Sequence, residues 1–111
     1  MIYRTGEVVQ LVSFLDRAWH AGASQFAGRA QCNDYSIGIE LEGCDDLPYT
    51  PAQYNALITL SAALCPHYAI SLERITGHQF IAPLRKTDPG LAFDWRFFKQ
   101  QLMAKLNLPP C

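Results

Sequence analysis

The sequence has little of what marks a nucleic-acid-binding, membrane or secreted protein. Its net charge is −1 and its pI is about 6.2, whereas a nucleic-acid partner normally leaves a basic face. There is no run of about 18 apolar residues, which excludes a transmembrane helix. The first residues, MIYRTGEVVQ, lack the apolar stretch of a signal peptide. We therefore expect no nucleic acid and no membrane as partners, and a cytoplasmic location.

The spacing of the cysteines provides no covalent framework either. Cys32, Cys44, Cys65 and Cys111 match neither a disulfide scaffold nor a paired zinc-ribbon motif, so reduced thiols are expected. Cys65 lies in an apolar run and is predicted to be in the core, while the terminal Cys111 is predicted to be exposed. The composition, 50% hydrophobic and 17% charged, is typical of one globular domain over residues 1–111.

Two helices carry clear start signals. In TPAQ, Thr50 as N-cap and Gln53 as the third helical residue predict a capping box, with a proline at the first helical position. Pro66 should end or kink this helix. A second helix is predicted from Asp94 toward Leu106, followed by a frayed tail, NLPPC. The apolar stripe of the first helix is formed by Tyr54, Leu57, Ile58, Leu64 and Cys65. That of the second helix is formed by Trp95, Phe98, Leu102 and Leu106.

Extended segments fill much of the N-terminal half. Residues 1–3 and 7–15 read as a hairpin around a glycine-containing turn, and residues 16–34 as a long loop. Residues 35–43 alternate strictly between apolar and other side chains, which predicts a strand with Glu40 at its centre, opposite the isoleucines. We therefore predict a mixed α/β fold, in which helices flank a small mixed sheet.

Residues 77–90, GHQFIAPLRKTDPG, combine chemically useful side chains with a rigid backbone. Their prolines and glycines argue against a regular helix or strand, and could hold His78 and Asp88 at ligand distance. Both are donor types of catalytic zinc sites. Lys86 would place a cation near an oxyanion. Glu40, in mid-strand, could accept a proton from the attacking water and return one to a leaving amine.

Each of these residues also has an ordinary structural interpretation. A lone histidine such as His78 is more often hydrogen-bonded than metal-bound, and the DPG sequence at Asp88 is common turn chemistry. Glu40 fits the solvated face of an edge strand. Arg85 and its neighbouring lysine are typical exposed charge, and a tryptophan such as Trp19 usually packs in a core.

A set of short segments together resembles one enzyme family. In order along the chain they are GEVVQ, RAWHAG, AQCNDYSIGIELEG, YTPAQY, TGH, IAP, RKTDPG and FDW. As a set they resemble the zinc-dependent N-acetylmuramoyl-L-alanine amidases of the phage T7 lysozyme type, and best the cytosolic anhydro-muropeptide branch, the AmpD-type amidases. No single segment would be specific.

The resemblance implies a reaction and a site. The expected reaction is zinc-dependent hydrolysis of the amide between anhydro-N-acetylmuramic acid and L-alanine in peptidoglycan recycling, with a muropeptide as substrate. The implied residues are the Zn²⁺ ligands His78 and Asp88, the catalytic Glu40 and Lys86, and Trp19, Asn33 and Arg85 beside the substrate. His20 is expected to be structural.

The resemblance covers roughly the C-terminal two thirds of such an amidase. The family's first zinc-ligand histidine lies on an N-terminal strand that would precede Met1, so we expect that strand and the following helix to be absent. With two of three protein ligands, zinc binding should weaken, and spacing supports none of His20, His67 or Cys32 as a replacement. An unpaired strand edge would be exposed, and dimerisation could cover it. The alternatives are a non-catalytic muropeptide-binding module and an inactive remnant.

Overall fold

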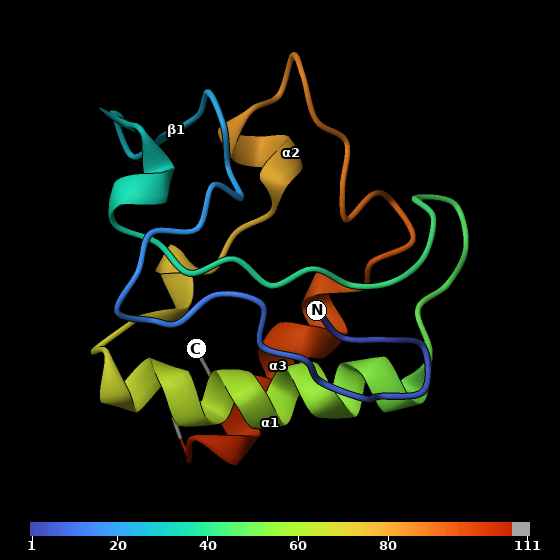
Figure 1. Ribbon diagram of the computed structural model, residues 1–111. Coiled ribbons are helices and arrows are strands. Elements are labelled where there is room, and N and C mark those ends of the chain that lie inside the picture. The colour runs from blue at the N-terminus through green and yellow to red at the C-terminus, as the bar shows by residue number, and fades with distance from the viewer. Residues whose placement is uncertain (108–111) are drawn as a thin grey trace.

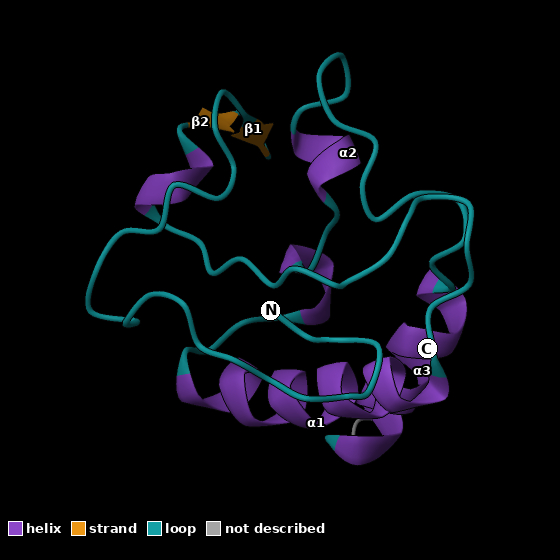
Figure 2. Cartoon of the chain, turned by 45° about the vertical axis from the view of Figure 1, so that its right-hand side comes forward, coloured by secondary structure: helices purple, strands orange, loops and turns teal. Residues whose placement is uncertain are grey.

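Two packed helices form the base of the molecule, and extended segments run across them (Figures 1 and 2). The computed structural model describes residues 1–107; most of the predicted frayed tail, and Cys111, lie outside the described residues. In chain order the elements are β1 (Gln25–Phe26), β2 (Arg29–Ala30), a 3-10 turn (Cys32–Asp34), α1 (Pro51–His67), a 3-10 turn (Leu72–Arg74), α2 (His78–Ile81) and α3 (Trp95–Lys105). α1 packs on α3, and α2 contacts β1 on the opposite side. Within residues 1–107, no helix has the length and apolar character needed to cross a bilayer.

Both predicted helices are confirmed, together with their start signals. The Thr50 hydroxyl accepts from the Gln53 backbone N–H at 3.1 Å, and the Gln53 side chain accepts from the Thr50 N–H at 3.0 Å. α1 ends at His67, one residue after Pro66, so the predicted end near this proline is confirmed. The Asp94 carboxylate caps α3 by accepting a backbone N–H of its first turn at 3.0 Å.

Gln53 also joins α1 to the extended segments. Its side chain is 1% exposed, and its amide nitrogen donates to the carbonyl of Ile2 at 3.3 Å and to that of Glu42 at 2.8 Å. A buried amide costs free energy unless its donors and acceptors are paired, and here both ends are used. This one polar residue therefore fixes the start of the helix against two segments far apart in sequence.

The apolar faces of the helices meet in one core. Its buried members are Ile2, Tyr49, Leu57, Ile58, Cys65, Phe93, Phe98 and Leu102. The predicted burial of Cys65 is therefore confirmed, and so are the predicted stripes except at Leu64, which is half-buried and outside this cluster. Trp95 packs against the same cluster. Phe98 is 1% exposed, and its ring lies 5.8 Å from that of Phe93 and 6.2 Å from that of Trp95.

We expect Phe98→Ala to lower the free energy of unfolding by about 3–5 kcal/mol, because it removes a fully buried ring and leaves a cavity. The neighbouring Phe97, which is 41% exposed, provides the control, and Phe97→Ala should cost clearly less. Urea denaturation followed by far-UV circular dichroism measures both. Equal losses for the two variants would contradict this description of the core.

The predicted strands are present as extended chain with little pairing. Ile2 bridges antiparallel to Val8 and parallel to Leu41, so the mixed character of the sheet is confirmed at this one residue. Pairing of the hairpin stops at Val9, and the prediction of a strand through residue 15 is wrong. Residues 36–42 alternate in burial as predicted, but within residues 1–107 only Leu41 has a bridge partner. Dimerisation through the remaining edge stays a prediction.

Two of the predicted loops contain short regular elements. The predicted long loop over residues 16–34 holds the antiparallel pair β1–β2, whose turn places Ala27 and Gly28 at positive φ, and then a 3-10 turn. Residues 77–90 begin with the helical turn α2, where a loop was predicted. Loops are predicted from the composition of several consecutive residues. A single turn of helix or a two-residue strand is too short to change that composition, so it is not predicted.

Candidate metal centre and active-site cavity

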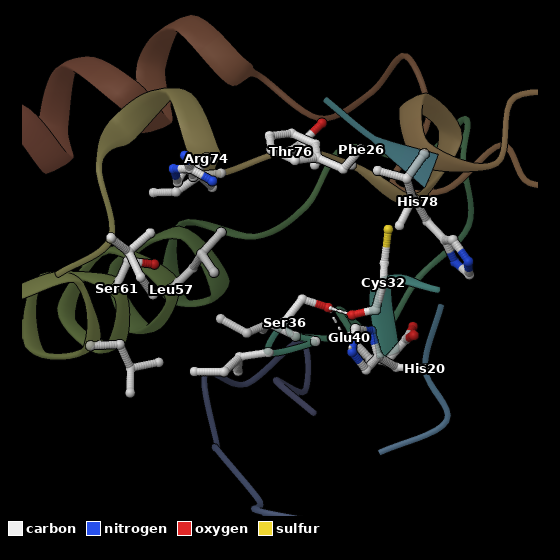
Figure 3. A pocket seen from close by; sticks show the side chains of 18 of the residues that line it. His20, Phe26, Cys32, Ser36, Glu40, Leu57, Ser61, Arg74, Thr76 and His78 are labelled. Atoms are coloured by element: carbon white, nitrogen blue, oxygen red, sulfur yellow. Dashed lines mark hydrogen bonds between the residues drawn. The ribbon is translucent and has the colours of Figure 1, made fainter. Parts of the chain in front are cut away.

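Three of the predicted catalytic and metal-binding residues are brought to one cavity of about 940 Å³. Its walls are the extended segment 33–41, the inner face of α1 and the start of α2. Glu40, His78 and Asp88 all line it. In Figure 3, the labelled side chains of His20 and Glu40 appear lower in the view than that of His78. Segments far apart in sequence therefore meet here, as the predicted site requires.

His78 is the first residue of α2, and its ring is oriented by a backbone carbonyl. Its Nε2 lies 2.9 Å from the carbonyl oxygen of Ala21. A carbonyl only accepts, so Nε2 carries a proton, and Nδ1 is the ring nitrogen that is left to face Asp88. Nδ1 lies 3.3 Å from Oδ2 of Asp88. The His78 side chain is 14% exposed and that of Asp88 is 44% exposed, so the pair faces the cavity from a half-buried position.

Two acceptor atoms at this distance need a cation between them, either a proton or a metal ion. Zinc binds nitrogen at about 2.0–2.1 Å and carboxylate oxygen at about 2.0–2.2 Å, so two ligands at tetrahedral positions are roughly 3.3–3.5 Å apart. The observed separation of 3.3 Å from Nδ1 to Oδ2 fits that geometry. The tautomer fits as well, because metal-bound histidines usually donate their other ring N–H to a carbonyl or carboxylate.

Within residues 1–107, no third His, Cys, Asp or Glu completes a metal-binding group. His20 is engaged elsewhere, with Nε2 3.2 Å from the Ser36 hydroxyl. The buried Cys32 thiol lies 3.2 Å from the Tyr35 hydroxyl, and His67 packs against the ring of Tyr68. These three side chains thus have contacts of their own among the described residues, and the set of two protein ligands stays a prediction.

Asp88 is held by a turn that is tied to its surroundings. The Asp88–Pro89 peptide bond is cis, and the Tyr49 hydroxyl donates to the Pro89 carbonyl at 2.8 Å. Burial raises the pKa of the Tyr49 phenol, and the nearby carboxylates of Asp45 and Asp88 raise it further, so the phenol stays a donor. Gly90, at φ +81°, lies so close to Asp45 that an added Cβ would be 2.6 Å from the Asp45 Cβ. The backbone around Asp88 is therefore fixed.

Glu40 takes the place that its alternation predicts. It is exposed on the face that it shares with Ser36 and Gly38, and its backbone carbonyl accepts the N–H of Ile2 at 2.8 Å. His20 packs on Gly38 so closely that an added Cβ there would lie 2.6 Å from the imidazole. The backbone next to Glu40 is thus held by contacts to Ile2 and His20, and Glu40 lines the same cavity as His78 and Asp88.

Lys86 is half-buried, and its backbone N–H donates to the carbonyl of Ala82 at 2.9 Å. It is not among the residues that line the cavity. Its predicted role beside an oxyanion therefore stays a prediction. The rest of the predicted catalytic set meets in one place.

The three predicted substrate-binding residues differ in what they present. Trp19 is 76% exposed, which rules out the core interpretation for its side chain. Asn33 lines the cavity, but its side-chain oxygen accepts the Ala21 N–H at 2.7 Å. Arg85 donates to the carbonyls of Ala21 and Ala23, at 2.5 and 3.0 Å. Asn33 and Arg85 thus fix the loop beside His78, and Trp19 is the one with a large free surface.

Comparison with known proteins identifies the family. Residues 1–91 match the Amidase_2 family, described as N-acetylmuramoyl-L-alanine amidase. The chain belongs to the N-acetylmuramoyl-L-alanine amidase family. Among its relatives is the 1,6-anhydro-N-acetylmuramyl-L-alanine amidase AmpD of Enterobacter cloacae, which is 57% identical over 102 residues, 92% of this chain and 54% of the relative. The chain thus spans about half the length of the relatives it matches, rather than the expected two thirds.

Solved structures of amidases share the fold of this chain. A selenomethionine derivative of AmpD matches with a TM-score of 0.85 and 55% identity, over 88% of this chain and 55% of that one. AmiD from E. coli, solved with anhydro-N-acetylmuramic acid-L-Ala-D-gamma-Glu-L-Lys, matches with a TM-score of 0.81 and 41% identity, over 86% of this chain and 40% of that one. The predicted amidase fold is confirmed.

Proposed function

We propose that this chain is a zinc-dependent amidase domain, over residues 1–111, that hydrolyses the amide between anhydro-N-acetylmuramic acid and L-alanine. The observation that carries the proposal is the His78–Asp88 pair, with Nδ1 and Oδ2 3.3 Å apart, in the same cavity as Glu40. Family membership and the relatives' names support the substrate class and a place in peptidoglycan recycling. The AmiD complex, which holds an anhydro-muropeptide, supports it further.

His78 and Asp88 are the residues that would hold the metal. His78 offers the lone pair of Nδ1, because its Nε2–H is committed to the Ala21 carbonyl. Asp88 offers a carboxylate oxygen and a negative charge. When bound, zinc supplies Lewis acidity, which lowers the pKa of water toward about 7 and polarises a carbonyl. The remaining ligand positions would be filled from beyond this pair.

Two further side chains would carry the proton transfers and the charge. Glu40 accepts a proton from the attacking water and later gives one to the nitrogen of L-alanine, as the C–N bond breaks and a carboxylic acid and a free amine form. The Lys86 ammonium offsets negative charge on the carbonyl oxygen. What supports Lys86 is its place in the RKTDPG segment, within the range that matches the family.

The test is an assay of the purified chain with added zinc and anhydro-N-acetylmuramoyl tripeptide. We expect zinc-dependent release of the peptide, and Lys86→Met should lower kcat by about 10²–10³-fold, as loss of an oxyanion-stabilising donor does. Lys105→Met, at the exposed end of α3, is the matched control and should leave kcat unchanged. Unchanged turnover in Lys86→Met would contradict its role.

A non-catalytic muropeptide-binding module is the second candidate function. Two observations favour it: residues 1–107 provide two metal donors rather than three, and Trp19 is exposed on a loop held by several hydrogen bonds. Elemental analysis separates the two candidates. Near-stoichiometric zinc supports the amidase, whereas muropeptide binding by a metal-free chain supports the module.

A further inference from the structure

Gln79 connects the two candidate metal ligands. It follows His78 directly in α2 and reaches the turn that carries Asp88 through two hydrogen bonds. Its backbone N–H donates to the Asp88 carbonyl at 2.9 Å, and its side-chain oxygen accepts the Gly90 N–H at 3.1 Å. The residue next to one ligand thus holds the backbone on both sides of Pro89, directly after the other ligand.

Two further hydrogen bonds of this turn come from a different part of the chain. The Thr87 hydroxyl donates to the Asp45 carboxylate, and the Pro89 carbonyl accepts from Tyr49. These contacts fix the turn to residues 45–49, which precede α1, and set its position in the molecule. The two hydrogen bonds of Gln79 come instead from α2, so they set the position of Asp88 relative to His78.

We propose that Gln79 is a positioning residue that sets the spacing between His78 Nδ1 and Asp88 Oδ2. The inference rests on the proposed metal site. A metal ion selects donor positions to within a few tenths of an ångström, so a turn that can move relative to α2 lowers affinity even when both donors remain. The backbone N–H of Gln79 contributes in any variant, and the side-chain oxygen is the part that substitution can remove.

The structure offers a pair of informative substitutions. Gln79→Met keeps the length of the side chain and removes the acceptor of the Gly90 N–H. Gln79→Glu keeps an acceptor oxygen at the same position. Gln100→Met, on the exposed side of α3, is the matched control for replacing glutamine by methionine. A residue that only stabilises the fold would affect thermal stability in proportion to metal affinity, whereas a positioning residue affects metal affinity at nearly constant stability.

The experiment measures zinc affinity by competition with a chromophoric chelator, together with the visible spectrum of the Co²⁺-loaded protein and the thermal melting of the metal-free protein. We expect Gln79→Met to weaken zinc binding by about 10–100-fold, which is the usual effect of removing a hydrogen-bonding group that orients a metal ligand. It should also change the cobalt spectrum. Gln79→Glu should keep the wild-type affinity or exceed it, and Gln100→Met should match the wild type. In the metal-free protein, amide exchange of Gly90 should be faster in Gln79→Met.

The outcomes distinguish the positioning role of Gln79 from the proposed metal site on which it rests. If wild-type protein binds zinc and Gln79→Met binds it equally well, the positioning role is wrong and the metal site stands. The positioning role is also wrong if Gln79→Glu loses as much affinity as Gln79→Met. If wild-type protein takes up neither zinc nor cobalt, the proposed metal site is wrong, and the positioning role with it.

Discussion

Glu40→Gln is expected to lower the amidase kcat by about 10²–10⁴-fold, the usual contribution of a positioned general base. Glutamine has the shape of glutamate but cannot accept a proton at neutral pH, so water is no longer activated and the leaving amine is no longer protonated. Zinc content should stay at the wild-type level, because the proposed metal donors are on His78 and Asp88.

The control for this variant lies two residues away on the same face. Glu42 also points away from the isoleucines, but its carboxylate accepts the backbone N–H of Arg4 at 2.7 Å, which gives it a structural role. Glu42→Gln should therefore leave kcat close to the wild-type value. Single-turnover kinetics on the anhydro-muropeptide substrate, with metal content measured on the same samples, tests both variants. Wild-type turnover by Glu40→Gln, or an equal loss in both, would remove Glu40 from the mechanism.

Asp88→Asn is expected to abolish the stabilisation that zinc gives the folded chain. A ligand present at 100 times its Kd stabilises a protein by about 2.7 kcal/mol, and the variant should show none of this gain at the same zinc concentration. The loss of zinc affinity should exceed the roughly 10–100-fold loss caused by removing a group that only hydrogen-bonds to a ligand, because here a donor atom and a negative charge are removed together.

Without metal, the same variant should be at least as stable as the wild type. When Nδ1 is unprotonated, its lone pair and that of Oδ2 face each other at 3.3 Å, whereas an asparagine side-chain N–H can donate to Nδ1. Thermal melting with and without zinc measures both effects. Asp46→Asn, at an exposed position in the segment 45–49, controls for the loss of one negative charge. A zinc-dependent rise in melting temperature equal to that of the wild type would show that Asp88 is not a ligand.

The features that the sequence predicted correctly are those set by near neighbours. The capping box around Thr50 and Gln53 and the cap at Asp94 depend on residues three apart, and the stripe through Phe98 and Leu102 depends on helical periodicity. The alternation of residues 36–42 correctly predicted which side chains face outward, including Glu40. It did not predict the pairing of this segment, because ladder hydrogen bonds depend on which other segments lie beside it.

The supporting contacts of the site could not be predicted in this way. His78 is oriented by the carbonyl of Ala21, 57 positions earlier, and every residue has a carbonyl, so no residue type signals the contact. Arg85 has the chemistry of a substrate-binding residue and instead holds the Ala21 loop. Gln79 carried no signal except its place next to a candidate ligand. Such contacts between distant segments become visible only in the folded chain.

The most direct test of the central claim is a crystal structure of the zinc-loaded chain, with anomalous diffraction measured on both sides of the zinc absorption edge. We predict one zinc peak in the cavity, about 2.0–2.1 Å from Nδ1 of His78 and about 2.0–2.2 Å from Oδ2 of Asp88, with the Nε2–H of His78 still on the Ala21 carbonyl. Zinc bound elsewhere, or no peak beside a pair whose side chains have turned away from each other, would contradict the account.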